Sequence, residues 1–380
     1  MSRIVVIAGG GTAGHVFPAL AVADALVARD ASIEPVFIGV ADRLEARLVP
    51  EAGYRLKLIS AASIPRQITP KLLRVPQQVR RGVREANRWV KELDPVAAVT
   101  FGGYVSFPVN RALARNNVPF VIHEQNSIFG VTNKLASRAA AKVAVSFPGS
   151  VTQLRRRDTV VFTGNPVRRS LLTTTLDDPT VKAHAYAQFG LDPHTPTLFV
   201  FGGSQGAARI NRAVLDAYPR WAGKNLQILH ATGERDFAAI DEAWGAVRRP
   251  DGPGVTVVPF INDMASAYAI TDLAVCRAGA TSMAELTACG IPAVLVPYPH
   301  ATADHQTKNA EALARTGGAR MIADDKLTGV SLDAAIEVMA DTTQMQKMRQ
   351  AAAVFGRRDA ADRVAQLVDE IARKPGSDVT

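Results

Sequence analysis

Apolar and polar positions along the chain follow two periods in turn, which predicts an alternation of strands and helices. In the first half, short unbroken apolar runs, typical of strands in a parallel sheet, alternate with stretches whose apolar residues recur at helical spacing. The predicted strands are Ile4–Ala8, Pro35–Val40, Lys57–Ser60, Ala97–Phe101, Phe120–His123 and Lys142–Ser146. The predicted helical stretches are Pro18–Arg29, Ala112–Asn116 and Val131–Arg138. This order predicts a doubly wound parallel sheet.

The pattern stops near Phe162–Arg168 and restarts at Pro196. The predicted strands of the second half are Thr197–Phe201, Gln227–Ala231, Val255–Pro259, Leu273–Cys276 and Ala293–Pro297. From about residue 331 the pattern is helical to the end of the chain, with a break at Gly356. We therefore predict an α/β fold with two Rossmann-like domains, at 1–163 and 164–350. A C-terminal helix and tail at 351–380 can pack back on the first domain.

Composition narrows the class of protein. Of the 380 residues 47% are hydrophobic, which is enough for two cores. No apolar run reaches the roughly 20 residues that cross a membrane. Met1 leads directly into a predicted strand without the features of a secretory signal, and Cys276 and Cys289 form no CxxC pair. These features predict a cytoplasmic protein without a structural disulfide.

Positive charge gathers in the first half of the chain. The net charge is +9 overall, with +11 in residues 1–163 and −2 in residues 164–380. The excess concentrates in residues 66–91, which hold eight Lys and Arg residues against Glu85 alone. In Lys71–Trp89 the cations alternate with apolar residues, and such a segment favours contact with an anionic membrane surface. A solvated helix that packs one face on its own domain is the alternative. Nucleic acid is disfavoured because aromatic residues for base stacking are sparse.

Three glycine-rich turns follow predicted strands, at 9–14, 102–103 and 202–206. Such turns let backbone N–H groups approach a phosphate, and the helix that follows adds partial positive charge. The first turn fits the GxGxxG pattern of NAD-binding proteins, which needs an acidic residue at the end of the second strand. Glu34 comes too early and Asp42 too late for that role. The turns at 9–14 and 202–206 instead predict two domains that face one nucleotide-linked substrate.

Candidate chemistry follows these turns. His15 directly follows the first turn, at a helix start, and is suited to general-base work or to capping and packing. The segment Arg277–Glu285 offers hydroxyls and a carboxylate to a nucleotide, and Tyr298–Gln306 can read sugar hydroxyls. A zinc site at His300, Asp304 and His305 lacks further ligands nearby in the sequence. His123–Asn126 can read hydroxyl or acetamido groups, or bond the ends of strands.

Taken together, the motifs resemble one family, the bacterial MurG glycosyltransferases. The resemblance runs from Arg3 to about Asn309 and rests on GGGTAGH, GGYVSFP, HEQN, TGNPVR, GGSQGA, RAGATSMAE and HQTKNA. It implies a GT-B fold with a deep interdomain cleft and no cofactor. It also implies inverting transfer of N-acetylglucosamine from UDP-GlcNAc to the 4-hydroxyl of undecaprenyl-diphosphate-linked N-acetylmuramyl-pentapeptide in peptidoglycan synthesis. Such a protein would lie peripherally on the cytoplasmic face of the cell membrane.

The same resemblance implies roles for particular residues. His15 would be the general base, and Thr12, Ala13, Gly14 and Asn126 would meet the donor sugar and the acceptor. The residues implied for the donor nucleotide and its sugar are Arg168, Ser204, Ile261, Ala280, Glu285 and Gln306. Thr281 and Ser282 are added as candidates for the hydroxyls that they offer beside Ala280. The chain departs from the family at His305-Gln306, where Gln-Gln is frequent, and at Phe107, where some members have glycine.

Three alternatives stay open on the sequence. A GT-B transferase could act on another lipid acceptor, such as a diacylglycerol. A UDP-GlcNAc epimerase shares the two-domain layout but has no need of the basic segment at 66–91. A non-enzymatic binder of anionic lipid would not use two phosphate-type turns.

Overall fold

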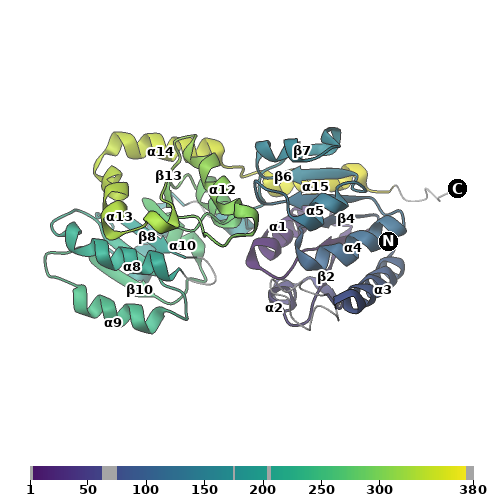
Figure 1. Ribbon diagram of the computed structural model, residues 1–380, viewed down its shortest axis with the longest axis horizontal. Helices are drawn as coiled ribbons and strands as arrows, with labels where there is room; N and C mark the ends of the chain where they lie inside the picture. The colour runs from purple at the N-terminus through teal and green to yellow at the C-terminus, as the bar shows by residue number, and fades with distance from the viewer. Residues whose placement is uncertain (1–2, 62–74, 174–175, 203–206, 374–380) are drawn as a thin grey trace. The chain divides into compact units, whose positions relative to one another are not determined.

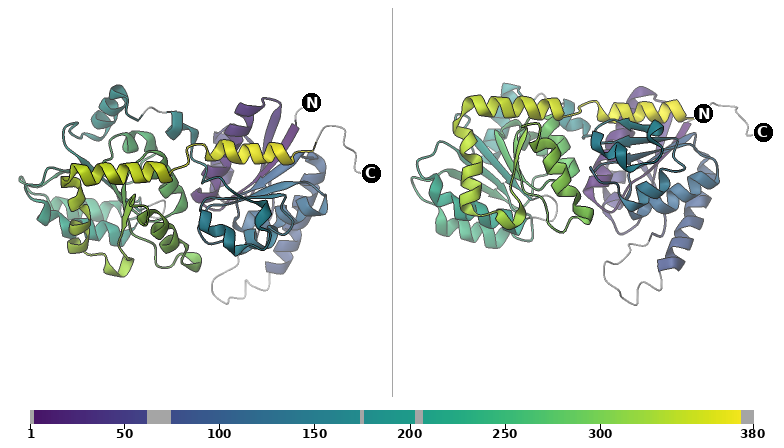
Figure 2. Two further views of the ribbon diagram at one scale, coloured as in Figure 1. Left: turned by 90° about the horizontal axis from the view of Figure 1, so that it is seen from above. Right: turned by 45° about the horizontal axis from the view of Figure 1, so that its top comes forward.

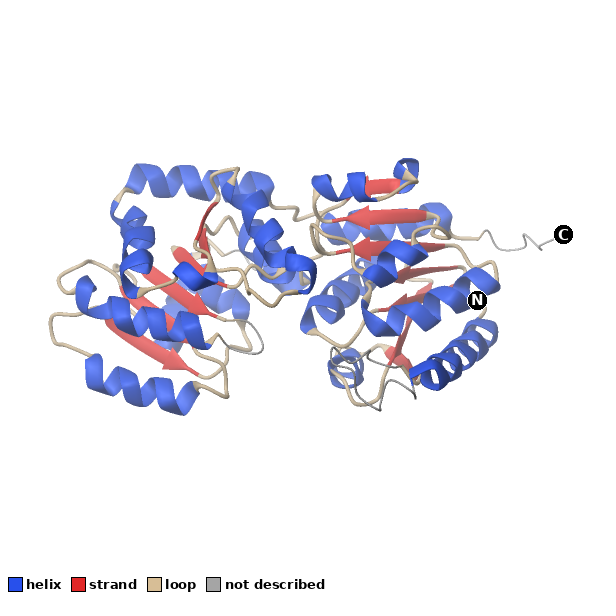
Figure 3. Cartoon of the chain, viewed as in Figure 1, coloured by secondary structure: helices blue, strands red, loops and turns tan. Residues whose placement is uncertain are grey.

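The structure is a computed structural model that describes residues 3–61, 75–173, 176–202 and 207–373. The chain separates into two compact units (Figure 1), one of residues 1–168 and 358–380 and one of residues 169–357. Each unit is built on one parallel sheet with helices on its faces (Figure 3). The prediction of two parallel-sheet α/β domains is confirmed.

The units change at residues 168 and 357, whereas we predicted boundaries at 163 and 350. The N–H groups of Thr163 and Gly164 donate to Val145 O, at 3.1 and 3.2 Å, so this segment still belongs to the first sheet. On the other side, Gly356 lies against the backbone of Thr287, where an added Cβ would be 2.4 Å from the carbonyl oxygen. The helix Thr342–Phe355, which ends just before Gly356, therefore belongs to the second unit.

The sheet of the first unit has the strand order β3-β2-β1-β4-β5-β6-β7. Its strands are β1 (Arg3–Ala8), β2 (Ile33–Gly39), β3 (Arg55–Leu58), β4 (Ala97–Thr100), β5 (Phe120–Glu124), β6 (Lys142–Val145) and β7 (Val160–Phe162). All neighbouring pairs are parallel. The order reverses between β1 and β4, so the loops after these two strands diverge at the point where doubly wound sheets bind ligands.

Two apolar layers cover this sheet. The helices of the unit are α1 (Ala13–Arg29), α2 (Leu44–Glu51), α3 (Val75–Leu93), α4 (Gly103–Arg115), α5 (Val131–Ala136) and α15 (Ala360–Ile371). Side chains alternate along β1: Val5 and Ile7 pack with α1 and α15, whereas Val6 and Ala8 pack with α3 and α4. Figure 2 shows α15 in yellow over this sheet, and α15 contacts α1, β4 and β5. The last helix of the chain thus completes the core of the first unit.

The sheet of the second unit has the order β10-β9-β8-β11-β12-β13. Its strands are β8 (Thr197–Phe201), β9 (Gln227–Ala231), β10 (Gly254–Val258), β11 (Leu273–Cys276), β12 (Ala293–Leu295) and β13 (Ala319–Met321). Its helices are α6 (Arg169–Thr173), α7 (Pro179–Phe189), α8 (Ala208–Ala217), α9 (Phe237–Val247), α10 (Met264–Ala269), α11 (Ala280–Ala288), α12 (His305–Ala314), α13 (Gly329–Ile336) and α14 (Thr342–Phe355). The order reverses between β8 and β11, which again marks the loops that follow them.

The first helix differs from its prediction. The apolar spacing predicted a helix from Pro18, but α1 begins at Ala13 and holds Pro18 in its interior. A proline there removes one intrahelical N–H donor, which makes it an unusual helix residue. Buried packing of Val16, Ala19 and Val22 holds the helix in place despite this. The earlier start puts His15 within the first helical turn.

A buried hydrogen-bond chain in the second unit makes its stability sensitive to acid. Trp244 Nε1–H donates to His230 Nδ1 at 3.0 Å, so the proton of the imidazole lies on Nε2, 3.0 Å from Asn211 Oδ1. Burial lowers the pKa of His230 from 6.5 to about 3. The folded protein therefore keeps this imidazole neutral at a pH where the unfolded chain protonates it.

We expect the free energy of unfolding to fall as the pH drops from 6.5 toward 3, because only the unfolded state binds the proton there. At pH 5 the share of His230 is roughly 2 kcal/mol. Urea unfolding at pH 7 and pH 5 measures it. The variant His230→Gln is less stable at pH 7 but loses less on acidification. An equal loss in both proteins would show that His230 titrates normally.

Candidate active site

The first glycine turn is shaped by close approaches that only glycine permits. A Cβ on Gly9 would lie 2.9 Å from Phe101 Cβ, and one on Gly11 would lie 2.7 Å from the ring of Tyr104. Gly11 also has φ +88°, a backbone conformation that favours glycine. The turn is therefore packed between the start of α1 and the loop after β4.

His15 lies on the first turn of α1, and its ring is held by Thr12. Thr12 occupies the N-cap position but its side chain makes no cap bond; its Oγ1 lies 2.9 Å from His15 Nδ1. Thr12 is exposed, and Ala13, Gly14 and His15 are half-exposed. If Nδ1–H donates to Thr12, Nε2 carries the lone pair that can take a proton. The N–H groups of Ala13 and Gly14 precede the first intrahelical hydrogen bonds, so they can face a ligand.

The second glycine turn lies beside the first, because β1 and β4 are neighbours. Gly102 and Gly103 have φ +83° and +76°. A Cβ on Gly103 would lie only 3.0 Å from Gly10 O and in ordinary contact with His15 Cε1, at 3.7 Å, so the second turn packs closely against the first beside the His15 ring. Phe107, the departure from the family pattern, lies inside α4 and is half-buried.

Of the segment His123–Asn126, only Asn126 reaches the surface. His123, Glu124 and Gln125 are buried and bond the interior: His123 Nε2 to Gly164 O, Glu124 to the N–H groups of Asn126 and Gly130, and Gln125 to Phe101 O. Burial lowers the pKa of His123 to about 4 and raises the pKa of Glu124. The hydrogen-bonding alternative therefore holds for these three residues, and Asn126 is left as the substrate candidate.

Arg168, the last residue of the first unit before the chain enters the second, lies beside α1. Its guanidinium lies 4.6 Å from the centre of the Phe17 ring, two residues beyond His15 on α1. Arg168 is half-buried. The arginine for which the resemblance implies a place near the nucleotide thus packs on the helix that carries the candidate base.

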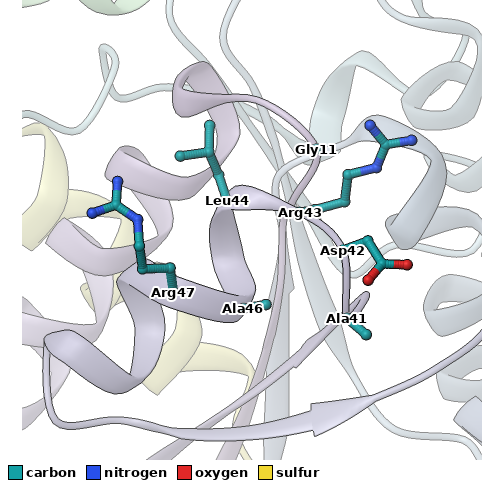
Figure 4. A pocket seen from close by; sticks show the side chains of 7 residues that line it. All are labelled: Gly11, Ala41, Asp42, Arg43, Leu44, Ala46 and Arg47. Carbon is teal, nitrogen blue, oxygen red and sulfur yellow. The ribbon is translucent and has the colours of Figure 1, made fainter.

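An open pocket of about 540 Å³ borders the first turn (Figure 4). It is lined by Gly11, Ala41, Asp42, Arg43, Leu44, Ala46 and Arg47. Arg43 also lies over Tyr104, 5.6 Å from the ring centre. The pocket leaves Gly11 accessible next to two guanidinium groups and one carboxylate.

In the second unit, the candidate donor residues follow β10, β11 and β12, whose carboxyl ends share one edge of the sheet. Ile261 follows β10 and is 7% exposed. Ala280, Thr281, Ser282 and Glu285 lie on α11, directly after β11. Ser204 and most of the third glycine turn lie outside the described residues. The structure therefore brings the candidates of each unit to the carboxyl edge of its own sheet.

Glu285 is a buried carboxylate on α11. It is 4% exposed, and its Oε2 accepts a hydrogen bond from Tyr268 OH at 3.1 Å. Burial raises the pKa of Tyr268 well above its usual value, so this hydroxyl stays a donor. On the same helix, Thr281 Oγ1 is buried and has no hydrogen-bond partner among the described residues. Tyr268 came from no sequence motif, because a tyrosine on another helix gives no local signal.

Gln306 has a fixed orientation at the start of α12. Its Oε1 accepts a hydrogen bond from Tyr298 N at 2.9 Å, which leaves the amide NH₂ as the group that can donate outward. His305 is turned to the chain instead: its Nδ1 donates to Thr302 O at 2.8 Å. This contact gives a structural role to the histidine that departs from the Gln-Gln pattern.

Two residues that sequence reasoning passed over tie the donor loops together. Arg277 Nη1 lies 2.6 Å from Asp324 Oδ1 and also donates to the carbonyl oxygens of Val296 and Pro297. Asn309, fully buried, donates from Nδ2 to Ala278 O at 3.2 Å. These bonds connect the loop after β11 to the loop after β12 and to α12. Both residues lie in recognised motifs, but only tertiary contact shows what they bond.

Among the residues that the structure describes, no three His, Cys, Asp or Glu side chains come together as a metal site. Cys276 is buried, and burial raises the pKa of its thiol to about 12. No helix in the described ranges is both long and apolar enough to cross a bilayer.

Comparison with known proteins identifies the family to which both units of the chain belong. Residues 5–145 match the glycosyltransferase family 28 N-terminal domain, and residues 197–364 match the C-terminal domain of that family. The UDP-N-acetylglucosamine-N-acetylmuramyl-(pentapeptide) pyrophosphoryl-undecaprenol N-acetylglucosamine transferase of Streptomyces avermitilis is 43% identical over 96% of this chain and 98% of its own length.

Solved structures of glycosyltransferases and related enzymes have a similar fold over nearly the whole chain. The crystal structure of MurG from Acinetobacter baumannii is 28% identical with a TM-score of 0.76, over 97% of this chain and all of that one. A UDP-GlcNAc 2-epimerase from Neisseria meningitidis has a TM-score of 0.69 at 12% identity, over 97% of this chain and all of that one, which shows a shared fold alone. The two-domain GT-B architecture and the full-length identity lead to one assignment: the chain is a glycosyltransferase of family 28 and belongs to the MurG family.

Proposed function

We propose that this protein transfers N-acetylglucosamine from UDP-GlcNAc to the 4-hydroxyl of undecaprenyl-diphosphate-linked N-acetylmuramyl-pentapeptide. The observation that carries the proposal is the Thr12–His15 pair, 2.9 Å apart, at the strand-order reversal of the first unit. It supplies a candidate base in a chain 43% identical to a transferase named for this reaction.

The acceptor hydroxyl is a weak nucleophile, so it needs a base in place as it attacks. With its proton on Nδ1 and donated to Thr12, His15 takes the hydroxyl proton at Nε2. The hydroxyl oxygen forms a bond to the anomeric carbon as the bond to the UDP oxygen breaks. One displacement inverts the configuration at that carbon. Thr12, Ala13, Gly14 and Asn126 border this reaction from the first unit.

The leaving UDP gains negative charge, which the second unit is suited to receive. The N-cap of α8, Ala207, makes no side-chain cap bond, and the first turn of α8 holds no acidic residue. Its N–H groups and partial positive charge favour a diphosphate, and Ser204 is assigned to the same group. We assign Ile261 to the uracil, Ala280, Thr281, Ser282 and Arg168 to the nucleotide, and Glu285 to the ribose. The proposal includes no cofactor.

Gln306 should read the donor sugar through its amide NH₂. We expect Gln306→Glu to raise KM for UDP-GlcNAc about tenfold, because the carboxylate still accepts from Tyr298 N–H but cannot donate to a sugar hydroxyl. Initial rates at varied UDP-GlcNAc measure this. Gln344→Glu, at an exposed position on α14, is the matched control. An unchanged KM for Gln306→Glu would remove Gln306 from the site.

Dependence on the acceptor tests the proposed reaction against its alternatives. UDP release is measured with UDP-GlcNAc alone, with the lipid-linked muramyl acceptor and with a diacylglycerol. We expect release only with the muramyl acceptor. Release that needs diacylglycerol would point to another lipid acceptor. Epimerised sugar without any acceptor would point to an epimerase, whose fold is shared.

We also propose that the protein lies peripherally on the cytoplasmic face of the cell membrane through its basic segment. In the described part of that segment, Arg80, Arg81, Arg84, Arg88 and Lys91 are exposed on α3. Gly82, Ala86 and Val90 on α3 are buried against the unit itself. The centre of the Trp89 ring lies 4.2 Å from Lys57 Nζ and 4.6 Å from Arg88 Cζ. Arg66, Lys71 and Arg74 lie outside the described residues. The exposed cations therefore make attraction to anionic lipid the main source of binding.

Charge reversal tests this surface. We expect Arg80, Arg81 and Arg84 changed together to Glu to weaken binding to anionic vesicles about 100-fold or more at low salt. Vesicle sedimentation measures the bound fraction. Reversal of the exposed Arg155, Arg156 and Arg157 changes the net charge equally and is the control. Equal loss in both variants would show an effect of net charge, and no loss at α3 would refute the proposed surface.

A further inference from the structure

A buried carboxylate that has no part in the proposed reaction accepts a hydrogen bond from the glycine turn beside His15. Glu45, the second residue of α2, is 1% exposed. Its Oε2 accepts from Gly11 N at 2.9 Å and its Oε1 accepts from Val40 N at 3.2 Å. One side chain thus joins the turn after β1 to the loop after β2. Both oxygens are committed to backbone N–H groups.

Two glycines make room for this carboxylate. A Cβ on Gly10 would lie 2.3 Å from Glu45 Oε1, and a Cβ on Gly39 would lie 2.6 Å from Glu45 Cγ. No side chain fits at either position unless Glu45 moves. The lack of a Cβ at Gly10 and Gly39 therefore leaves the space that the Glu45 side chain occupies.

The hydrogen bond between Glu45 and Gly11 is connected to His15 through Thr12. Gly11, which Glu45 holds, precedes Thr12, and Thr12 Oγ1 lies 2.9 Å from His15 Nδ1. The ring of Tyr104 also packs against Gly11, since a Cβ there would lie 2.7 Å from it. A shift of the turn would move the Thr12 hydroxyl and, with it, the orientation of the imidazole.

We propose that Glu45 is a positioning residue that fixes the 10–12 turn, and so sets the orientation of His15 for proton transfer. The inference rests on the role of His15 in the proposed function. Glu45 is 1% exposed and both of its oxygens accept backbone N–H groups, so the role proposed for it acts through the turn. Because it already takes the Gly11 N–H, a phosphate at this turn is left with the N–H groups of the first turn of α1.

Glu45→Gln is the sharpest change, since it keeps the size of the side chain but leaves one of the two N–H groups facing an amide NH₂. We expect kcat to fall about tenfold or more, with KM for UDP-GlcNAc within about twofold. Glu51→Gln, an exposed position on the same helix, is the control and should keep the wild-type rate. Unchanged kcat in Glu45→Gln would overturn the proposal.

A double-mutant cycle separates positioning from general destabilisation. In a His15→Ala background, Glu45→Gln should cost less than about twofold in the residual rate, because no base remains to be oriented. An equal cost in both backgrounds would overturn the proposal. If Glu45→Gln folds poorly, Glu45→Asp, which keeps the charge but cannot span both N–H groups, is used in its place.

Nuclear magnetic resonance of the His15 ring gives a readout that needs no activity. We expect Glu45→Gln, and not Glu51→Gln, to shift the ring nitrogen signals of His15 and to speed amide exchange at Gly11. Unchanged signals would overturn the positioning role even if transfer proceeds. Failure of the wild-type protein to transfer GlcNAc, with these shifts present, would refute the proposed function instead.

Discussion

Replacement of His15 by alanine is expected to lower kcat about 1000-fold while KM for UDP-GlcNAc stays within about twofold. The imidazole lies on the first turn of α1, bonded to Thr12, and the proposal gives it the proton of the acceptor hydroxyl. Loss of the base slows the chemical step but leaves the donor-binding residues of the second unit in place. Steady-state kinetics with both substrates varied measure the two parameters separately.

The control for this change is His184→Ala, at an exposed position on α7. It should turn over at the wild-type rate. The pH dependence of kcat adds a second check, because the wild-type rate should fall as the pH drops through the pKa of the base, and the His15→Ala variant should lack that limb. Turnover of His15→Ala near the wild-type rate would leave His15 as a capping or packing residue, the alternative that its sequence position allowed.

Replacement of Glu285 by alanine is expected to weaken UDP-GlcNAc binding about 100-fold, because a carboxylate that accepts from two ribose hydroxyls makes two charge-assisted hydrogen bonds. Isothermal titration with UDP-GlcNAc measures the affinity. The same change leaves the Tyr268 hydroxyl buried without the acceptor it has now at 3.1 Å, so part of the loss could come from local rearrangement.

Two further variants separate these causes. Tyr268→Phe keeps the carboxylate and removes its buried donor, and we expect it to weaken binding by less than about tenfold. Glu285→Gln keeps an acceptor for Tyr268 but loses the charge, and should bind nearly as poorly as the alanine variant. If Glu285→Gln binds UDP-GlcNAc as the wild type does, the carboxylate is a structural partner of Tyr268 and not a ribose ligand.

Buried strands were the part of the fold that the sequence predicted best. Thr197–Phe201, Gln227–Ala231 and Leu273–Cys276 have the predicted bounds, because strands covered on both faces are mostly apolar and stand out from the polar loops around them. The strands β7 and β13 were missed, since each is three residues long and lies at an edge of its sheet, where one neighbour is enough to hold it. The unit boundaries differ from the predicted ones because Gly164 N–H bonds the first sheet at Val145 O and Gly356 packs against Thr287 of the second unit.

Site residues could be predicted where a motif follows a strand end. Glycine turns with His15, and the segments at Arg277–Glu285 and Gln306, all lie at the carboxyl edges of the sheets. What could not be predicted is how these residues are held. The bonds from Tyr268 to Glu285, from Gly11 to Glu45 and from Asn309 to Ala278 join residues that lie 17 to 34 positions apart in the chain. Such pairs have no period or spacing that a single sequence reveals.

The first two glycine turns have separate roles in this account. The first, which is hydrogen-bonded to Glu45, positions His15. We assign binding of an acceptor-side phosphate to the N–H groups of the first turn of α1. The second presses against the first through Gly103 and Gly10, and so helps to shape the same site. We assign the donor diphosphate to the third turn, which precedes α8.

The structure of the product shows whether the protein carries out the proposed inverting transfer. Purified protein is incubated with UDP-GlcNAc labelled in the sugar and with the lipid-linked muramyl-pentapeptide, and the lipid fraction is analysed by mass spectrometry and by magnetic resonance at the new anomeric centre. We predict one added N-acetylglucosamine on the 4-hydroxyl of the muramyl sugar, in the β configuration, inverted from the α-linked donor. Label that stays in water-soluble sugar, or a product with retained configuration, would refute inverting transfer to the muramyl acceptor.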